Sequence, residues 1–368
     1  MKRRWTKDEI WKWWDEHDWF MGLNYVPSCM PGTSLWQEDT MEEALETVIP
    51  ELDLIKELGF NSVRMFGPFF ALWVHEGDRF LNRFDTVLDL LDERGIGMMP
   101  VIGNDCVNFG RPDDISIRHP AGHEKWDLGH HGGHADSPFI GDKVRRGWIY
   151  WDEEAYRDTC ENFIHAMFER FGQDRRIQMW DMWNEPGNSN RGGMSIPWIM
   201  RAYEIARSKD PVAPLTACTW KYPPDYGRDP AAQLQEIERL CVDLSDVVSF
   251  HQYGDFDSVR ATVAMLEREG RPMANTEWLH RIFDNFIEDN LPLYFEKKIA
   301  SYHWGLVAGN SQHYLPWHDI KGRPGLDYSR WQHDIFRQDG HTPYDEKEIA
   351  LFREYGQRKG EAGKQSIR

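Results

Sequence analysis

Two short motifs in the sequence carry glutamates in settings that suit acid–base chemistry. The first, IQMWDMWNEPGN, places Asn184 and Glu185 after an apolar run and before a Pro-Gly pair that forces a turn. The second, RPMANTEWLHR, ends another apolar run with Glu277. A carboxylic acid at the dry end of a strand suits general-acid catalysis, because burial favours its protonated form. Two such groups can cleave a glycosidic bond, one protonating the leaving oxygen while the other attacks the anomeric carbon.

Glu185 and Glu277 are far apart in the sequence, so the fold must bring them together. Short apolar runs alternate with helical patterns, which is typical of βα units around a parallel sheet. The expected strands cover residues 19–25, 62–66, 97–102, 177–183, 215–218, 247–250, 273–276 and 300–304. The expected helices cover residues 41–58, 79–94, 153–171, 195–208, 231–243, 258–269 and 287–298. Eight strands predict a (β/α)₈ barrel of the α/β class, whose fourth and seventh strands aim both glutamates into one mouth.

An open doubly wound sheet would show a similar alternation of strands and helices. That fold often binds nucleotides, but no G-x-G-x-x-G or GK[ST] loop follows a predicted strand. We therefore favour a single catalytic barrel domain over residues 1–368, which exceeds the roughly 250 residues of a typical barrel. Nothing in the sequence indicates a linker or a second domain.

Three segments depart from plain βα alternation. The amino-terminal segment contains Trp5, Trp11, Trp13, Trp14 and Trp19, partly at helical spacing, and is expected to form a helix that closes the barrel bottom. Residues 103–150 after the third strand and residues 305–342 after the eighth are far longer than usual βα loops, and such loops are usually functional. Both leave the carboxyl ends of strands, where the active sites of barrels lie.

Composition and charge exclude several classes of function. The 18 Trp residues are in excess and favour a carbohydrate site, because indole faces stack on sugar rings. The net charge of −18 argues against nucleic-acid or anionic-membrane partners, whose phosphates would be repelled. No apolar run is long enough for a membrane span, and the amino terminus lacks the pattern of a signal peptide. Five scattered cysteines without a C-x-x-C motif suit reduced thiols, so a cytoplasmic location is expected.

Further motifs stand at other predicted strand ends. NSVRMFG carries Arg64 in the second strand, HQYG follows the sixth with His251 and Tyr253, and SYHWG ends the eighth with Trp304. Together with W-N-E-P after strand four and T-E-W after strand seven, this series resembles the clan A glycoside hydrolases. It is most similar to family five, whose members are retaining β-glycosidases.

The resemblance implies roles for the residues of these motifs. Glu185 would be the general acid/base and Glu277 the nucleophile, while Asn184 would hydrogen-bond the 2-hydroxyl of the sugar. Arg64 and the Tyr253 hydroxyl would keep Glu277 ionised. No cofactor and no metal is implied, because two carboxylates suffice for this reaction.

The resemblance implies Trp304 as the floor of the sugar subsite and His251 as a further substrate-binding residue. One position departs from the family pattern. Family five commonly has a His near the end of strand three, where this chain reads MMPVIGNDCVNFG. Asn104 or Asp105 takes that place, which changes a hydrogen-bonding partner of the bound sugar.

The loop after the third strand is rich in histidine, with His119, His123, His130, His131 and His134. Imidazoles at such spacing can bind zinc. We favour the alternative that some of them, with Trp126, line or cap the sugar pocket, because Gly-rich loops seldom hold rigid ligand geometry.

The function expected from the sequence is exo-acting hydrolysis of short oligosaccharides, with β-mannosides favoured over β-glucosides and β-xylosides. The absence of an export signal and the two long loops, which could close one end of a cleft, favour exo action. The alternatives are an endo-acting β-glycanase, a non-catalytic carbohydrate-binding barrel and a metal-dependent barrel hydrolase.

Overall fold

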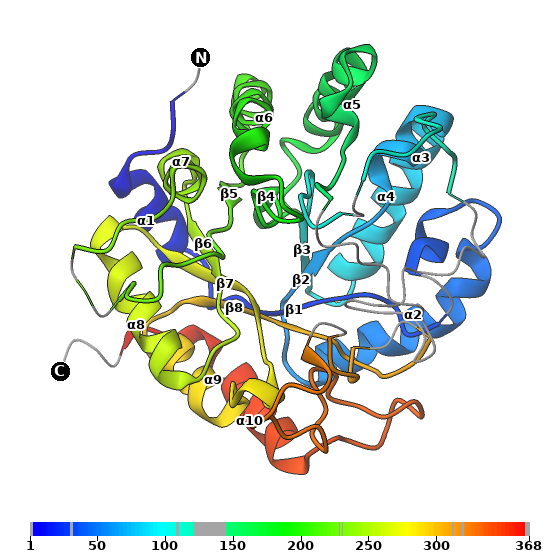
Figure 1. Ribbon diagram of the computed structural model, residues 1–368. Helices are drawn as coiled ribbons and strands as arrows, with labels where there is room; N and C mark the ends of the chain where they lie inside the picture. The colour runs from blue at the N-terminus through cyan, green and yellow to red at the C-terminus, as the bar shows by residue number, and fades with distance from the viewer. Residues whose placement is uncertain are drawn as a thin grey trace.

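The computed structural model describes residues 3–29, 32–107, 110–120, 145–227, 229, 231–310, 313–317 and 320–364. Eight parallel strands lie at its centre and helices surround them (Figure 1). The strands are β1 (Met21–Asn24), β2 (Ser62–Met65), β3 (Gly97–Pro100), β4 (Trp180–Trp183), β5 (Leu215–Ala217), β6 (Val248–His251), β7 (Met273–Trp278) and β8 (Ala300–Trp304). Each strand begins within three residues of its predicted start.

The strands follow one another around a closed ring. Six of them form one sheet in the order β3-β2-β1-β8-β7-β6, and β4 pairs with β5. Isolated parallel bridges such as Val101 to Asp181 and Thr219 to Phe250 join the two groups of strands on both sides. Every residue of every strand is buried, as expected of strands with side chains facing a barrel interior on one side and helices on the other. The predicted (β/α)₈ barrel is confirmed.

The helices are α1 (Lys7–Asp15), α2 (Met41–Glu57), α3 (Phe69–Glu76), α4 (Asp78–Asp92), α5 (Glu154–Phe171), α6 (Ile196–Ser208), α7 (Glu236–Leu244), α8 (Phe256–Leu266), α9 (Ile287–Glu296) and α10 (Glu346–Gln357). The sequence did not predict α3 and α10. Helix α3 is short and separated from α4 only by Gly77, whose φ of 54° suits glycine. In the described residues, no helix has the length and apolar character that crossing a membrane requires.

Helix α1 closes the amino-terminal end of the barrel, as expected. The Thr6 hydroxyl accepts from the Glu9 amide and the Glu9 carboxylate accepts from the Thr6 amide, so a capping box fixes its first turn. The buried side chains of Ile10 and Trp14 pack on Phe20, which precedes β1, and on Met179, which precedes β4. The opposite, carboxyl-terminal end of the barrel is therefore left for the site.

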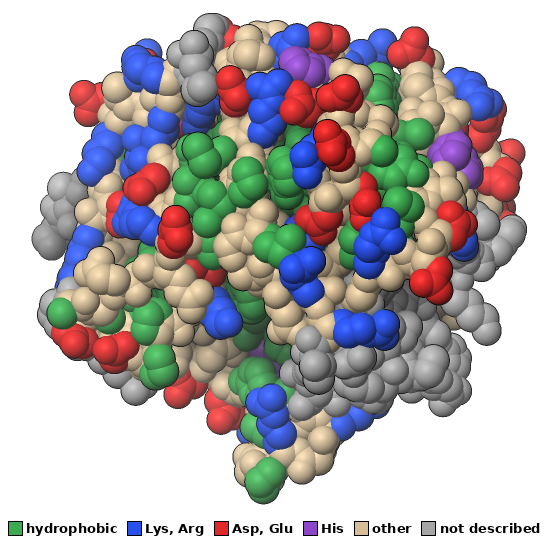
Figure 2. Space-filling view, turned by 45° about the horizontal axis from the view of Figure 1, so that its top comes forward, with side chains coloured by type: hydrophobic (Ala, Val, Ile, Leu, Met, Phe, Trp, Pro, Cys, Tyr) green, Lys and Arg blue, Asp and Glu red, His purple; other side chains and the backbone are tan. Residues whose placement is uncertain are grey.

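The two long connections leave that carboxyl-terminal end, as predicted. One runs from β3 to α5 and the other from β8 to α10. Figure 2 shows one face of the molecule with a hollow near its centre, in which hydrophobic and histidine side chains are visible.

Candidate active site

Glu185 lies on a tight turn directly after β4. Its backbone has a φ of 42°, a left-handed conformation that costs a non-glycine residue about 1–3 kcal/mol and is concentrated at functional sites. Several contacts hold the turn. The Glu185 amide donates to Cys218 Sγ over 3.2 Å, and the Gly187 amide donates to Asp105 Oδ2 over 2.7 Å. The Asn188 side chain donates to Glu185 Oε2. Glu185 is therefore fixed before any ligand arrives.

Glu277 lies inside β7, three strands along the barrel from the strand that precedes Glu185, and is buried. The sequence placed it just beyond the strand, but β7 continues through Trp278. Arg64 Nη1 donates to Glu277 Oε1 and the Tyr253 hydroxyl donates to Oε2, each over 2.7 Å. Burial by itself would raise the pKa of Glu277. Electrostatic attraction from His251 and Arg64, together with donated hydrogen bonds, outweighs it and holds the pKa of Glu277 below its usual value. Glu277 is thus an anion at neutral pH.

Arg64 is fully buried at the centre of this network. Its guanidinium binds Asp181 over 2.7 Å and also donates to Asn24 and Asn184. An Arg fork suits several planar acceptors at once, and removal of a buried charge leaves its partners uncompensated. Arg64 therefore orients both Glu277 and Asn184.

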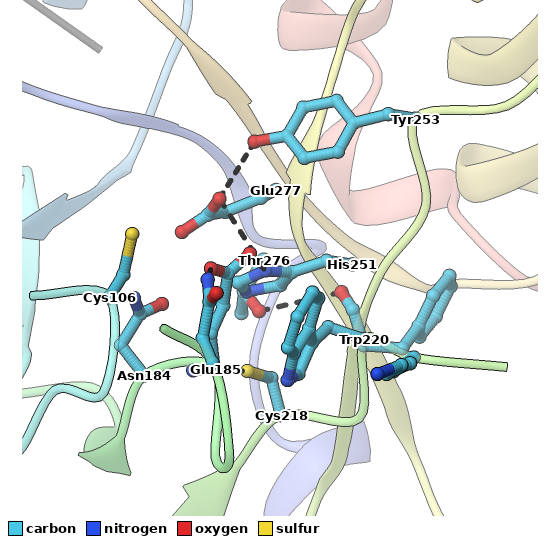
Figure 3. A network of polar contacts seen from close by, with 12 residues as sticks. Cys106, Asn184, Glu185, Cys218, Trp220, His251, Tyr253, Thr276 and Glu277 are labelled. Atoms are coloured by element: carbon cyan, nitrogen blue, oxygen red, sulfur yellow. Dashed lines mark hydrogen bonds and ion pairs between the residues drawn. The ribbon is translucent and has the colours of Figure 1, made fainter. Parts of the chain in front are cut away.

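His251 lies between the two glutamates at the end of β6. Its Nδ1 atom is 3.1 Å from Glu185 Oε1 and 3.4 Å from Glu277 Oε2. One carboxylate oxygen of Glu185 and one of Glu277 lie within 4.8 Å of each other. In Figure 3 the three side chains point toward one another, and the Tyr253 hydroxyl reaches Glu277 from the other side. Retaining glycosidases have carboxyl groups about 5–5.5 Å apart, against about 6.5–9.5 Å in inverting ones.

The end of β3 contributes Asn104 to the site. Asn184 Nδ2 donates to Asn104 Oδ1 over 2.9 Å, and Asn104 forms a bridge with Asn184 in the backbone. Asp105 turns away and binds Arg191 over 3.0 Å in the buried support of the Glu185 turn. Of the two residues that the sequence offered for this position, Asn104 is therefore the one beside the site.

Trp304 ends β8 close to Glu277. Its ring stacks on Phe66 at 5.7 Å between centroids, and a hydrogen bond from it contributes to the lowered pKa of Glu277. The side chain is buried. Trp304 thus lies where a floor of the sugar subsite is expected.

The long loop after β8 reaches the same region. Trp317 packs edge-on against Tyr253 at 4.9 Å and against His280 at 4.6 Å. The sequence did not single out Trp317, because its position in a long loop gives no periodic signal. The Trp317 and His280 rings therefore lie beside the Tyr253 ring, whose hydroxyl contacts Glu277.

Two acidic residues that the sequence analysis missed support the site. Asp181, which binds Arg64, lies inside β4, and an acidic residue within an apolar strand is a signal that could have found it. Glu238 in α7 accepts hydrogen bonds from the Trp220 and Lys221 amides. The Trp220 indole donates to the Pro186 carbonyl, so Glu238 supports the segment beside Glu185. Burial raises the pKa of Glu238 to about 8.

Trp126 and the histidines 123, 130, 131 and 134 lie outside the described residues. His119 is described, and its Nε2 contacts Glu76 of α3. Within the described ranges, the group of acidic and histidine side chains that could hold a metal ion is Glu185, His251 and Glu277 themselves. Nitrogen and oxygen donors of this kind suit Zn²⁺.

No protein-family model matches the sequence, and no curated protein sequence matches it. Solved structures do match the fold. An endo-β-1,4-mannanase from Thermotoga petrophila has a TM-score of 0.54 at 13% identity, over 94% of this chain and 78% of that one. A glycoside hydrolase family 5 mannosidase from Rhizomucor miehei has a TM-score of 0.55 at 13% identity, over 94% of each chain.

A third similar structure is an exo-β-1,4-mannosidase from Opitutaceae bacterium strain TAV5, with a TM-score of 0.54 at 15% identity. The match covers 92% of this chain and 60% of the length of that enzyme. The chain therefore shares its barrel fold with glycoside hydrolases of family five.

Proposed function

We propose that this protein is a retaining β-glycosidase in which Glu185 is the general acid/base and Glu277 is the nucleophile. The observation that carries the proposal is the pair of carboxylates within 4.8 Å in unlike surroundings. Glu277 accepts hydrogen bonds from Arg64 and Tyr253, which favour its anion. Glu185 contacts the neutral amide of Asn188 and the His251 ring, and no arginine binds it in the described part of the chain.

In the first step, the Glu277 carboxylate attacks the anomeric carbon and the bond from that carbon to the glycosidic oxygen breaks. Protonated Glu185 gives its proton to the departing oxygen, which leaves as an alcohol. The sugar is then held on Glu277 as a glycosyl ester, and Glu185 is an anion. Arg64 stays bonded to Glu277 and moderates the change in charge there.

In the second step, Glu185 takes a proton from water, whose oxygen attacks the anomeric carbon. The ester bond to Glu277 breaks, which releases the sugar and restores both carboxylates to their starting states. Two inversions at one carbon give net retention. The same residue serves first as acid and then as base.

For the substrate, we propose exo-acting hydrolysis of short oligosaccharides with β-mannosides favoured. Two of the similar structures are named as mannosidases and one of these as an exo-β-1,4-mannosidase. The loop after β8, which brings Trp317 against Tyr253, supports a site closed on that side. We also propose a cytoplasmic location on the basis of the sequence, and the five free cysteines are compatible with it.

A screen of nitrophenyl α- and β-glycosides over the common pyranoses and furanoses tests the proposal. We expect turnover of β-pyranosides, with β-mannoside foremost, and a first product of β configuration by proton NMR. Loss of turnover in Glu277→Gln and Glu185→Gln would support the assigned roles. A first product of α configuration from a β-glycoside would exclude the double displacement.

Two further functions have an observation in their favour. One similar structure is named as an endo-β-1,4-mannanase, which supports endo action in an open cleft. The donor set of Glu185, His251 and Glu277 supports a metal-dependent hydrolase. Activity that is lost with a chelator and restored by stoichiometric zinc would favour the metal-dependent alternative over the two-carboxylate mechanism.

A further inference from the structure

A pocket of about 490 Å³ lies beside the Glu185 turn and is rich in arginine. Its walls come from the loop after β3, the start of α5 and the start of α6. The residues that line it include Arg111, Arg145, Arg146, Trp148, Arg157 and Trp198. Such a gathering of positive charge is unusual on a chain whose net charge is −18.

The acidic side chains in this pocket already have arginine partners. Glu153 is bound by Arg111 over 2.6 Å, and the Trp148 indole also donates to it. Asp152 receives two hydrogen bonds from Arg191, over 2.7 and 2.9 Å. Positive charge in excess of these pairs is therefore left in the pocket.

Arg157 and Arg146 supply that excess. The Arg157 guanidinium lies over the Trp198 ring at 4.7 Å from its centroid, while its Nε donates to the Trp151 carbonyl. Stacking holds the guanidinium in place, and its outer amino groups have no acidic partner in the described residues. Arg146 is exposed and likewise has no acidic partner there. A guanidinium can donate two parallel hydrogen bonds to a carboxylate or phosphate, and the stacked Arg157 is preorganised for this.

The pocket is joined to the Glu185 turn by short contacts. The Gly147 amide donates to the Ser189 carbonyl over 2.6 Å, and Arg191 donates to the Gly147 carbonyl over 2.8 Å. Asn188, which precedes Ser189 in the sequence, donates a hydrogen bond to Glu185. A ligand that reaches across this turn would therefore place one of its groups in the pocket and another at Glu185.

We infer that this pocket binds the anionic group of an acidic saccharide, a sugar unit that carries a carboxylate or a phosphate. The saccharide part of the inference rests on the proposed function, since the pocket contacts, through Gly147, the turn that carries the proposed acid/base. The anion part rests on the arginines alone. The expected substrates therefore include short oligosaccharides in which one sugar unit carries such an anionic group.

Calorimetric titration of the full chain tests the inference without turnover. The probes are methyl β-glucuronide, glucose 6-phosphate, neutral methyl β-glucoside and inorganic sulfate. We expect at least one of the two charged sugars to bind about tenfold more tightly than the neutral glycoside, and the tighter one identifies the anionic group. Its affinity should fall as salt is raised from about 50 to about 500 mM, because the charges are partly exposed to solvent.

Matched variants locate the binding. Arg145→Ala/Arg146→Ala should weaken the charged sugar by about fivefold or more, and Arg157→Gln should also weaken it. The control Arg260→Ala/Arg353→Ala removes the same charge from exposed ion pairs on α8 and α10 and should change the affinity less than about twofold. Equal loss in control and test variants would overturn the site.

Two other outcomes would also overturn it. Neutral and charged sugars of equal affinity would exclude an anion site, and sulfate as tight as the sugars would exclude a saccharide site. Failure of the proposed function would be seen separately. A protein that binds the charged sugar through these arginines but hydrolyses no glycoside would support the anion site and contradict the proposed glycosidase activity. A protein that hydrolyses glycosides but does not bind the charged sugar more tightly would support the proposed activity and contradict the anion site.

Discussion

The Tyr253 hydroxyl donates to Glu277 Oε2 over 2.7 Å, while Arg64 donates to the other oxygen of the same carboxylate. Each oxygen of the proposed nucleophile therefore has one strong donor. Burial raises the pKa of the Tyr253 hydroxyl, so this group stays a donor at neutral pH. The arrangement holds the carboxylate in one orientation and in its charged form.

Tyr253→Phe should therefore lower kcat/KM and shift its acid limb to higher pH. A hydrogen bond to a charged group contributes about 1.5–3 kcal/mol, which corresponds to roughly a 10- to 150-fold loss. Glu277 must be ionised to attack, and loss of a donor raises its pKa, so activity should fade at a higher pH than in the wild type. The pH profile of kcat/KM measures this.

Tyr294→Phe is the matched control for that prediction. It removes a buried hydroxyl that contacts Asn275 and not a proposed catalytic group. An unchanged acid limb in Tyr253→Phe, or an equal shift in Tyr294→Phe, would show that Tyr253 does not stabilise the Glu277 anion.

Arg64→Met should destabilise the fold as well as remove activity. Breaking a buried ion pair from one side costs about 3–5 kcal/mol, because Asp181 and Glu277 would be left as unpaired buried charges. Urea unfolding measures the loss. The control Arg79→Met breaks an exposed pair with Glu38, which should cost about 1 kcal/mol or less. Similar losses in both variants would mean that the buried ion pairs of Arg64 contribute no more to the free energy of unfolding than an exposed pair does.

Glu185→Ala should distinguish substrates by their leaving groups. Poor leaving groups need protonation, so their hydrolysis should fall far more than that of activated aryl glycosides. Azide should restore turnover and give a β-glycosyl azide from a β-glycoside, because the alanine leaves room on the side from which water attacks. Steady-state rates with alkyl and dinitrophenyl glycosides, with NMR of the azide product, measure this. Equal losses without rescue by azide would remove Glu185 from the acid/base role.

Alternating apolar and helical patterns were enough to predict the barrel, and two strand-end motifs were enough to place both glutamates at one mouth of it, because these are local features of the sequence. Contacts between residues that lie far apart in the sequence could not be predicted in this way. The four partners of Arg64 come from β1, β4, the end of β4 and β7, and no pattern within one strand indicates such a set. The choice between Asn104 and Asp105 likewise depended on Arg191, which lies far along the chain and draws Asp105 away.

Two helices were missed for different physical reasons. Helix α3 reads FFALWVHE, which is too short and too apolar to show one amphipathic face. Helix α10 has a local signal, since Asp345 caps it and Ile349 and Phe352 are buried at helical spacing. It follows a long irregular connection, so alternation of strands and helices did not point to it.

Glu238→Gln should flatten the dependence of stability on pH. Burial raises the pKa of Glu238 to about 8, so the folded state holds a proton that the unfolded chain loses at lower pH. The contribution of this group is fully present below the unfolded pKa and is lost as pH rises through about 8. The wild type should therefore lose stability between about pH 5 and pH 9, of the order of 4 kcal/mol from this group.

Urea unfolding of the wild type and Glu238→Gln at a series of pH values measures that difference. The amide cannot titrate, so the variant should lose less stability over the same range. Glu288→Gln, an exposed residue of α9, serves as the control and should follow the wild type. Parallel curves for all three proteins would show that Glu238 does not hold its proton in the folded state.

The loop after β8 makes the mode of cleavage testable. Trp317 packs against Tyr253, so this loop covers the side of the site on which Glu277 receives its hydroxyl donor. A site closed on that side would accept one sugar beyond the scissile bond, and a mannotetraose should release mannose from the first turnover. Chromatography of early products, with the viscosity of a polymeric mannan as a second measurement, distinguishes this from endo action.

Trp317→Ala should then change the product pattern if this loop forms the closed end, because removing the indole opens space beside Tyr253. Disaccharide should appear earlier, while the configuration of the products stays retained, since neither glutamate is altered. Trp331→Ala is the control, because it removes an indole that contacts Tyr314 and Tyr344 in the same connection but not Tyr253. Early di- and trisaccharides and a rapid loss of viscosity from the wild type itself would reject exo action and favour the endo-glycanase.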